Sequence, residues 1–306
     1  METDSGNNIP ERDGHGAVGH VPVLLKEAID FLAVKRGGTY LDATVGLGGH
    51  SYEIAKRLGA PGHLIGFDKD PAALERARER LMTTLDELPE VTLIHGSFAE
   101  VAERIAPASL DGLMADLGVS SLQLGDAARG FSFQAEGPLD MRMNPMSGET
   151  AEQVVNHLDE RKLADVIYEF GEERRSRRIA RAIVRSRPIR TTQHLVEVIS
   201  TAARSMKHER IHPATRTFQA LRIFVNRELD DLTALLEAAP RVLKPGGRLV
   251  VISFHSLEDR IVKDALRGGK DKYFRVLTKK PLTASEEEID RNPRSRSAKM
   301  RVAERM

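Results

Sequence analysis

The residues with the clearest chemical pattern lie in two stretches near the start of the chain. The first, Leu41–His50, reads LDATVGLGGH, an apolar run that ends in glycines, and the second, His63–Asp68, is an apolar run that ends in a carboxylate. Glycines let the backbone approach a ligand closely, and an acid at the end of the next strand can accept hydrogen bonds from ribose hydroxyls. Together the two stretches predict an adenosine-binding pocket.

The same turn argues against a nicotinamide cofactor. The dinucleotide fingerprint has a third glycine where strand and helix pack closely, and Tyr52 stands at that position here. A nicotinamide dehydrogenase is therefore the disfavoured alternative for this adenosine-binding pocket.

The amino-acid composition excludes several kinds of catalytic and metal-binding site. The chain has 306 residues, 41% of them hydrophobic and 30% charged, and no cysteine. Without cysteine there are no disulfides, thiolate metal sites, iron–sulfur clusters or cysteine nucleophiles. No stretch is long and apolar enough to span a membrane, and the first residues lack the basic-then-apolar order of a signal peptide. We expect a cytoplasmic protein.

The charge is balanced overall but uneven along the chain. The net charge is +1, yet arginines crowd the segment from Arg174 to Arg190 and basic residues crowd the tail from Arg291 to Arg305. Such clusters can neutralise phosphates, although a charge run is often only the solvated face of a helix. Charge alone leaves both interpretations open.

Strand and helix patterns alternate through much of the chain. Apolar runs predict strands at 63–67, 91–95, 110–116 and 248–254, with two more at 273–278 and 299–303. Alternation with helices implies a parallel sheet, which binds ligands at the carboxyl ends of its strands. Three acids and an aromatic residue lie at or near these ends: Asp42, Asp68, Asp116 and Phe98.

Other segments break this alternation. Residues 1–19 are polar and predict a disordered arm, and 120–148 predict a long loop too apolar for disorder and therefore functional. Residues 149–212 have helical periodicity throughout and predict an all-helical insertion that carries the arginine cluster. One long helix, Thr215–Ala238, is expected where the sheet resumes.

Seven motifs distributed along the chain carry a family resemblance. They are HVPVL at 20–24, DATVGLGGHS at 42–51, DLGVSSLQL at 116–124, RGFSF at 129–133, LDMRM at 139–143, IHPATRTFQALRI at 211–223 and ISFHSLEDR at 252–260. With these motifs the chain resembles the bacterial MraW-type methyltransferases, the RsmH family. The main departures, the N-terminal arm and residues 83–90, touch no motif.

The resemblance implies a class I S-adenosylmethionine methyltransferase, with a Rossmann-like seven-stranded sheet and an inserted all-helical domain. The core would comprise 20–148 and 213–306, and the substrate-recognition insertion 149–212. The resemblance also implies the reaction: S-adenosyl-L-methionine methylates the N4 amine of cytosine 1402 in 16S ribosomal RNA, at the decoding centre of the small ribosomal subunit.

Site residues follow from the matching positions. The cofactor residues implied by the resemblance are Gly48, Gly49, His50, Asp68, Phe98, Asp116 and Gln123. Candidate contacts to RNA are the arginines Arg142, Arg174, Arg178, Arg181 and Arg216. No metal and no membrane are expected as partners, and the sequence leaves a homodimer open.

The catalytic candidates are Asp116, Ser253 and His255. Many amino-methyltransferases have an Asp/Asn-Pro-Pro-aromatic motif after the fourth strand; this chain shares only the acid, so Asp116 could contact either the target amine or the cofactor. Ser253 and His255 end the fifth strand and could line a pocket for a base that leaves its stack, or could be buried capping residues.

Two competing patterns are weaker. His208–His212 matches the zinc-protease pattern HExxH, but Pro213 moves His212 away from helical geometry. Ser253, His255 and Asp259 suggest a hydrolase, but the GxSxG elbow is missing. A non-catalytic RNA-binding scaffold, and a methyltransferase acting on a protein or small molecule, remain alternatives.

Overall fold

A computed structural model describes residues 22–84, 87–203, 211–268 and 272–306. Seven strands form one sheet in the order β3-β2-β1-β4-β5-β7-β6. The strands are β1 (Thr39–Asp42), β2 (His63–Asp68), β3 (Glu90–His95), β4 (Leu110–Asp116), β5 (Leu243–Ser253), β6 (Phe274–Val276) and β7 (Lys299–Arg305). The first five are parallel, and β7 runs antiparallel to both of its neighbours. The predicted seven-stranded α/β fold is confirmed.

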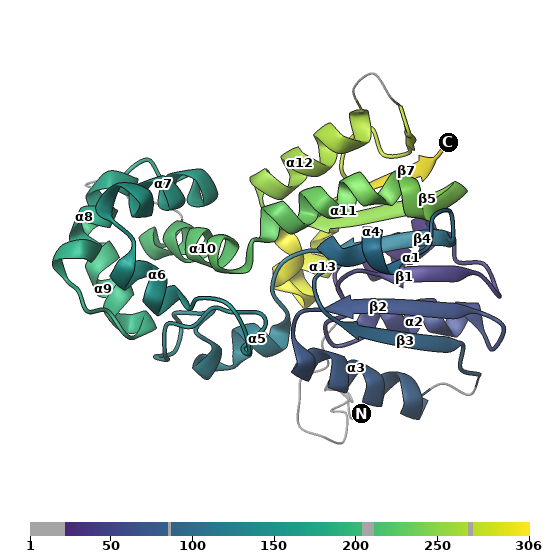
Figure 1. Cartoon of the computed structure of the whole chain (residues 1–306), viewed down its shortest axis with the longest axis horizontal. Helices are drawn as coiled ribbons and strands as arrows, with labels where there is room; N and C mark the ends of the chain where they lie inside the picture. The colour runs from purple at the N-terminus through teal and green to yellow at the C-terminus, as the bar shows by residue number, and fades with distance from the viewer. Residues whose placement is uncertain (1–21, 85–86, 204–210, 269–271) are drawn as a thin grey trace, which may run out of the picture.

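Helices cover both faces of the sheet (Figure 1). One face packs against α1 (Leu25–Leu32), α2 (Gly49–Leu58) and α3 (Pro71–Thr84), and the other against α4 (Val101–Arg104), α11 (Glu228–Val242) and α12 (Ser256–Arg267). The central strands β2, β4 and β5 are buried on both faces, which explains why they are continuous apolar runs, whereas the edge strands β3 and β6 are partly exposed.

The strand order reverses between β1 and β4. The chain leaves β1 toward β2 and β3 on one side, then returns to place β4 on the other side of β1. Loops that follow strands diverging in this way leave a crevice at their carboxyl ends, where α/β proteins bind ligands.

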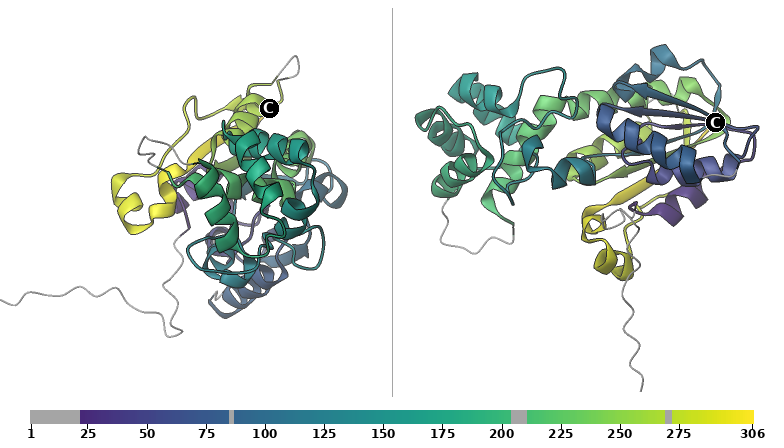
Figure 2. Two further views of the ribbon diagram at one scale, coloured as in Figure 1. Left: turned by 90° about the vertical axis from the view of Figure 1, so that its left-hand side faces the viewer. Right: turned by 90° about the horizontal axis from the view of Figure 1, so that it is seen from below.

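A helical unit stands beyond those carboxyl ends (Figures 1 and 2). It contains α6 (Ala151–His157), α7 (Glu160–Gly171), α8 (Ser176–Arg185), α9 (Thr192–Ala203) and α10 (Pro213–Asn226). Its hydrophobic cluster also includes Phe131, Leu139 and Met141 from the preceding loop and Phe218 and Leu221 from α10. The packed unit is thus wider than 149–212, because residues on both sides of that range complete its core.

The single helix expected over Thr215–Ala238 is wrong. The chain forms α10 and α11 with Arg227 between them in the left-handed conformation, φ 53°. The left-handed backbone of Arg227 ends one helix and starts the next. The apolar residues on either side keep their helical spacing, so the break is not visible in the sequence pattern. The acids in the first turn of α11 are a helix-start signal that the sequence does carry.

Shorter elements complete the chain. They are α5 (Ser121–Gly125), α13 (Glu286–Arg291) and the 3₁₀ turns Phe98–Glu100, Ala127–Arg129 and Pro293–Ser297. Within the described ranges, no helix has the length and apolar character needed to cross a membrane. The arm expected at 1–19 lies outside the described residues.

Candidate active site

The glycine turn after β1 is shaped by two backbone requirements. Gly48 precedes α2 with φ +74°, a conformation that side chains with a Cβ rarely adopt. A Cβ on Gly49 would lie 2.3 Å from Cγ of Pro22. Below the turn, the buried carboxylate of Asp42 accepts hydrogen bonds from the Thr44 amide at 3.0 Å and the Ser51 hydroxyl at 2.6 Å. The turn is therefore rigidly built, and its first helical turn faces the crevice.

Asp68, at the end of β2, supports this turn from the neighbouring strand. Its carboxylate accepts hydrogen bonds from the Gly46 amide at 2.7 Å and the Asp70 amide at 2.8 Å. Burial raises the pKa of Asp68 to about 6, against the opposing effect of these two amides. The group is ionised at neutral pH and titrates just below it.

One pocket collects most of the expected cofactor residues. It is lined by Gly49, His50, Asp68, Phe98, Asp116 and Gln123, which come from the ends of four strands and from α5. Gly48 is not among the lining residues; its α-carbon faces α3, where a Cβ would lie 3.2 Å from Ala77. The left-handed conformation of Gly48 sets the shape of the turn, and the adjacent residues Leu47 and Gly49 line the pocket.

Asp116, at the end of β4, has an unpartnered oxygen in this pocket. Its Oδ1 is buried and accepts no hydrogen bond from any residue that the structure describes, while its Oδ2 lies 3.7 Å from Nδ1 of His50. Burial, followed by the negative charges of Asp42 and Glu258, raises the pKa of Asp116 well above its ordinary value. A buried polar atom without a partner is costly and indicates that a ligand group completes the site.

Two further acids line the pocket and were missed from the sequence. Glu228 forms a two-fold ion pair with Arg222, at 2.8 and 2.9 Å. Glu258 accepts hydrogen bonds from the amides of Phe254 and His255, at 2.8 and 3.3 Å. Glu258 completes a capping box that begins at His255, a pattern that the spacing could have revealed. Both acids are already partnered, unlike Asp116.

Gln123 lines the pocket, but its side-chain nitrogen and oxygen both form hydrogen bonds with other residues of the protein. Its Nε2 donates to Asp70 at 3.0 Å, and its Oε1 accepts from the Ser120 amide at 3.0 Å. Asp70 also pairs with Arg129 at 2.7 Å, and Arg129 donates to the carbonyls of Arg142 and Met143. This buried network fixes the 120–148 loop to the end of β2.

A second set of contacts holds residues 141–143 of that loop beside the pocket. The side-chain oxygen of Asn226 accepts from the Met143 amide at 2.7 Å, and its nitrogen donates to the Met141 carbonyl at 2.7 Å. Lys69 donates to the Asn226 carbonyl and pairs with Asp231, both at 2.6 Å. Met143 and Lys69 both line the pocket. The joint between α10 and α11 therefore holds the loop over the cofactor crevice.

The other two catalytic candidates, Ser253 and His255, form their hydrogen bonds outside the cofactor pocket. The Ser253 hydroxyl donates to the Lys299 carbonyl at 3.2 Å, on the neighbouring strand. His255 caps α12, with its Nδ1 accepting from the Glu258 amide at 3.4 Å. Neither residue lines the pocket. Nε2 of His255 lies 3.1 Å from Oε1 of Glu258, and the catalytic roles of His255 and Ser253 stay predictions.

The arginines expected to contact RNA fall into three places. Arg142 forms a two-fold ion pair with Asp140, at 2.9 and 2.8 Å, close to the pocket. Arg174 and Arg216 line a groove between the helical unit and α12. Arg178 and Arg181 line a shallower hollow on α8 and α9. The sequence cluster is thus divided between two surfaces.

Of the two competing patterns, only the hydrolase pattern lies wholly within the described residues, and it does not assemble into a site. Asp259 pairs with Arg301 at 2.6 Å and Ser253 with a backbone carbonyl, so no hydrolase triad forms. Nδ1 of His212 accepts from the Ala214 amide at the start of α10, and the rest of the HExxH pattern lies outside the described residues.

The sheet order, the glycine turn and an acid at the end of β2 define a class I methyltransferase that uses S-adenosylmethionine. The chain belongs to the MraW methylase family, whose model matches residues 17–306. It is 69% identical to the ribosomal RNA small subunit methyltransferase H of Koribacter versatilis over 99% of both chains. It is 65% identical to the protein of the same name from Acidobacterium capsulatum, over 94% of this chain and 98% of that one. The alternative of a nicotinamide dehydrogenase is thereby wrong.

Proposed function

We propose that this protein transfers the methyl group of S-adenosylmethionine to the N4 amine of cytosine 1402 in 16S ribosomal RNA of the small ribosomal subunit. The relatives' names support ribosomal RNA of the small subunit as the substrate. The observation in this structure that carries the reaction is the buried, unpartnered Oδ1 of Asp116 in the cofactor pocket.

The residues of the pocket fit the cofactor chemically. Asp68 would accept the ribose hydroxyls, the amides of the turn at Gly46–Gly49 would face the amino-acid part, and Phe98 would pack against the adenine. The acids around the pocket suit a cofactor that carries a positive sulfonium. S-adenosylmethionine supplies an electrophilic methyl group when it is bound.

Asp116 would then act on the acceptor amine. The N4 lone pair of cytosine is delocalised into the ring, so the amine is a weak nucleophile until it becomes pyramidal. A carboxylate oxygen of Asp116 that accepts an N4–H bond would favour that change and would orient the nitrogen for methyl transfer. Bound S-adenosylmethionine would supply the methyl group and leave as the neutral thioether, and Oδ1 of Asp116 or water would take the N4 proton.

Surfaces outside the pocket support a nucleic-acid substrate. The hollow lined by Arg178, Arg181 and Arg185 has a volume of about 820 Å³ on the helical unit. Arg181 is held by Glu160 at 3.3 Å, which orients it without removing it from solvent. A nucleotide has to leave its stack to reach the pocket, and contacts on both sides of it would offset that cost. Because bacterial ribosomes are assembled in the cytoplasm, we expect the protein to act there.

The decisive experiment is mass spectrometry of small-subunit RNA from cells with and without this protein. We expect one N4-methylcytidine to be missing when the protein is absent and to return with the wild-type gene, but not with Asp116→Ala. Unchanged RNA would contradict the proposal. Transfer of labelled methyl groups to protein or to small molecules in the same lysate would favour the alternative acceptors.

A further inference from the structure

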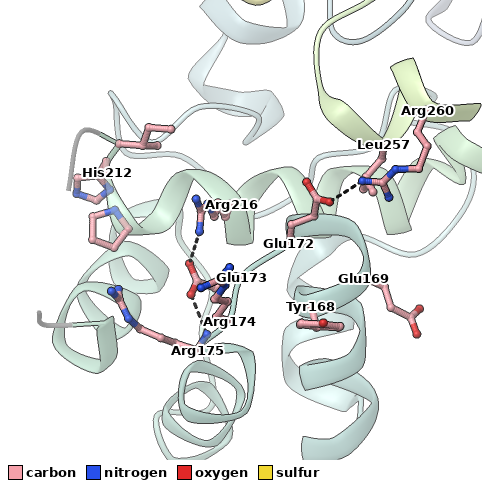
Figure 3. Close-up of a pocket in the computed structure, with 12 residues that line it drawn as sticks. Tyr168, Glu169, Glu172, Glu173, Arg174, Arg175, His212, Arg216, Leu257 and Arg260 are labelled. Carbon is pink, nitrogen blue, oxygen red and sulfur yellow. Dashed lines mark hydrogen bonds and ion pairs between the residues drawn. The ribbon is translucent and has the colours of Figure 1, made fainter. Parts of the chain in front are cut away.

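The groove between the helical unit and the sheet domain is separate from the cofactor pocket. It has a volume of about 940 Å³ and lies between the end of α7, the start of α10 and the first turn of α12 (Figure 3). No residue lines both cavities. They meet at α12, where Leu257 and Arg260 face the groove and Glu258 faces the cofactor pocket. The first turn of α12 thus contributes residues to both cavities.

The groove combines cations with exposed apolar side chains. Four arginines line it together with three glutamates: Arg174, Arg175, Arg216, Arg260, Glu169, Glu172 and Glu173. Two of the glutamates are neutralised inside the groove, since Glu172 pairs with Arg260 at 3.1 Å and Glu173 with Arg216 at 3.7 Å (Figure 3). These two pairs leave Arg174, Arg175 and Glu169 as the charged residues of the groove outside them, so the groove keeps a small positive net charge.

Arg174 is the cation best placed to bind a phosphate. It is exposed and lines the groove, and it makes no ion pair with any residue in the part of the chain that the structure describes. Its neighbours are already engaged: Arg175 donates to the Ala203 carbonyl at 3.1 Å. An arginine without an internal partner can form a two-fold contact with a phosphate at no cost to the fold.

Tyr168 and Ile211 are the apolar surfaces of the groove. Tyr168 is 59% exposed and Ile211 is 53% exposed. Large apolar side chains that are grouped and exposed in this way indicate a surface that binds a ligand. An exposed aromatic ring beside arginines is the arrangement on which unpaired bases stack. A duplex keeps its bases inside and would use only the arginines.

We propose that this groove binds single-stranded RNA next to the target nucleotide, with a base stacked on Tyr168 and a phosphate held by Arg174. This inference rests on the proposed function for the identity of the RNA, but not for the mode of binding. It assigns Tyr168 and Ile211 a role in substrate binding.

The test measures RNA binding and methyl transfer separately. The probe is a labelled single-stranded RNA of mixed sequence, titrated with the full chain, and the variants are Tyr168→Ala, Tyr168→Phe and Arg174→Gln. We expect Tyr168→Ala to weaken RNA binding by about tenfold, Tyr168→Phe to bind as the wild type, and Arg174→Gln to weaken binding and lower its salt dependence. The affinity for S-adenosylmethionine should stay unchanged in all three.

Two matched controls lie away from the groove. Tyr273, 47% exposed near the edge of the sheet, serves as Tyr273→Ala, and the exposed Arg267 at the end of α12 serves as Arg267→Gln. Both should bind RNA as the wild type. Photocrosslinking should join the RNA to the tryptic peptide that contains Tyr168.

Three results would overturn the inference. They are wild-type binding by both Tyr168→Ala and Arg174→Gln, equal competition by a duplex of the same sequence, and crosslinks confined to α8 and α9. Loss of the proposed function would appear differently, as normal RNA binding without N4-methylcytidine. A groove that instead captures a ribosomal protein would leave the RNA titration of every variant unchanged, which also contradicts the inference.

Discussion

Nδ1 of His50 lies 3.7 Å from Oδ2 of Asp116, and this histidine is held in place by a contact of 3.1 Å between its Nε2 and the Val23 carbonyl. The histidine therefore faces one oxygen of the carboxyl group, while the other oxygen faces the pocket without a partner. The arrangement fixes the direction of the carboxyl group before any ligand binds.

Replacing the carboxyl group of Asp116 should raise the stability of the protein while it removes the activity. Because the pKa of Asp116 is raised in the folded state, the folded protein holds this proton more tightly than the unfolded chain, and stability falls as pH rises above the ordinary value. Asp116→Asn should therefore abolish methylation and yet unfold at a higher temperature than the wild type. The gain should be larger at about pH 8 than at about pH 5.

The measurements are thermal unfolding at both pH values and a methyl-transfer assay. Calorimetric titration of Asp116→Ala with S-adenosylmethionine shows whether cofactor binding or turnover is lost. Full activity of either variant would contradict a role for Asp116 in both steps.

Cofactor affinity should depend on the ionisation of Asp68. Its pKa is raised to about 6, and only the ionised carboxylate accepts hydrogen bonds from both ribose hydroxyls while it accepts those of Gly46 and Asp70. Affinity for S-adenosylmethionine should be highest above that pH and fall as the pH is lowered through about 6. Calorimetric titration between about pH 5 and about pH 8 measures this.

The control for this dependence is Asp68→Asn. It should bind the cofactor more weakly at every pH and lose the inflection near 6, because the titrating group is gone. An inflection that persists in this variant would assign the pH dependence to another group of the pocket.

Removing the amide of Asn226 should loosen the loop over the pocket. Asn226→Ala leaves the Met143 amide and the Met141 carbonyl without their partners, at a cost of about 1–3 kcal/mol in the free energy of unfolding. Faster dissociation of S-adenosylmethionine should accompany this loss, since Met143 lines its pocket. Chemical unfolding and stopped-flow displacement measure the two effects.

A threonine on the same segment provides the comparison. Thr233 lies on the exposed side of α11, where its hydroxyl donates to the Leu229 carbonyl at 2.8 Å. Thr233→Ala should change cofactor dissociation little. If Asn226→Ala dissociates at the wild-type rate as well, the loop does not depend on this contact.

The arginines of α8 should contribute a salt-dependent part of RNA binding. Each arginine that neutralises a phosphate releases a counterion, so Arg178→Gln and Arg181→Gln should each reduce the slope of log affinity against log salt by about 1. A filter-binding series over salt concentration measures the slope. If both variants have the wild-type slope, these arginines do not contact RNA phosphates and α8 is only a solvent-exposed helix face.

The periodicity of apolar residues determined most of the architecture. Seven strands, the helices between them and the helical insertion follow from local patterns, because a buried strand and an amphipathic helix each have a spacing that can be read without tertiary contacts. The glycine turn and Asp68 could be placed at one crevice because parallel strands bring their carboxyl ends to the same edge.

Contacts between distant segments could not be read in this way. Asn226 holds Met143 across 83 positions of the chain, and Glu172 reaches Arg260 across 88. Neither pair has a local pattern, and the single left-handed residue Arg227 that makes the first possible leaves the apolar spacing intact. The same holds for the hydrogen bond from the Ser253 hydroxyl to the Lys299 carbonyl, 46 positions away.

The amino-acid sequence by itself thus determined the fold, the family and the residues around the cofactor crevice, since these depend on local spacing and on motifs. Only the tertiary structure decided which of those residues keep a free polar atom. That depends on packing: both polar ends of the Gln123 side chain bond to neighbouring residues, whereas Asp116 has one buried oxygen in the pocket with no partner among the described residues.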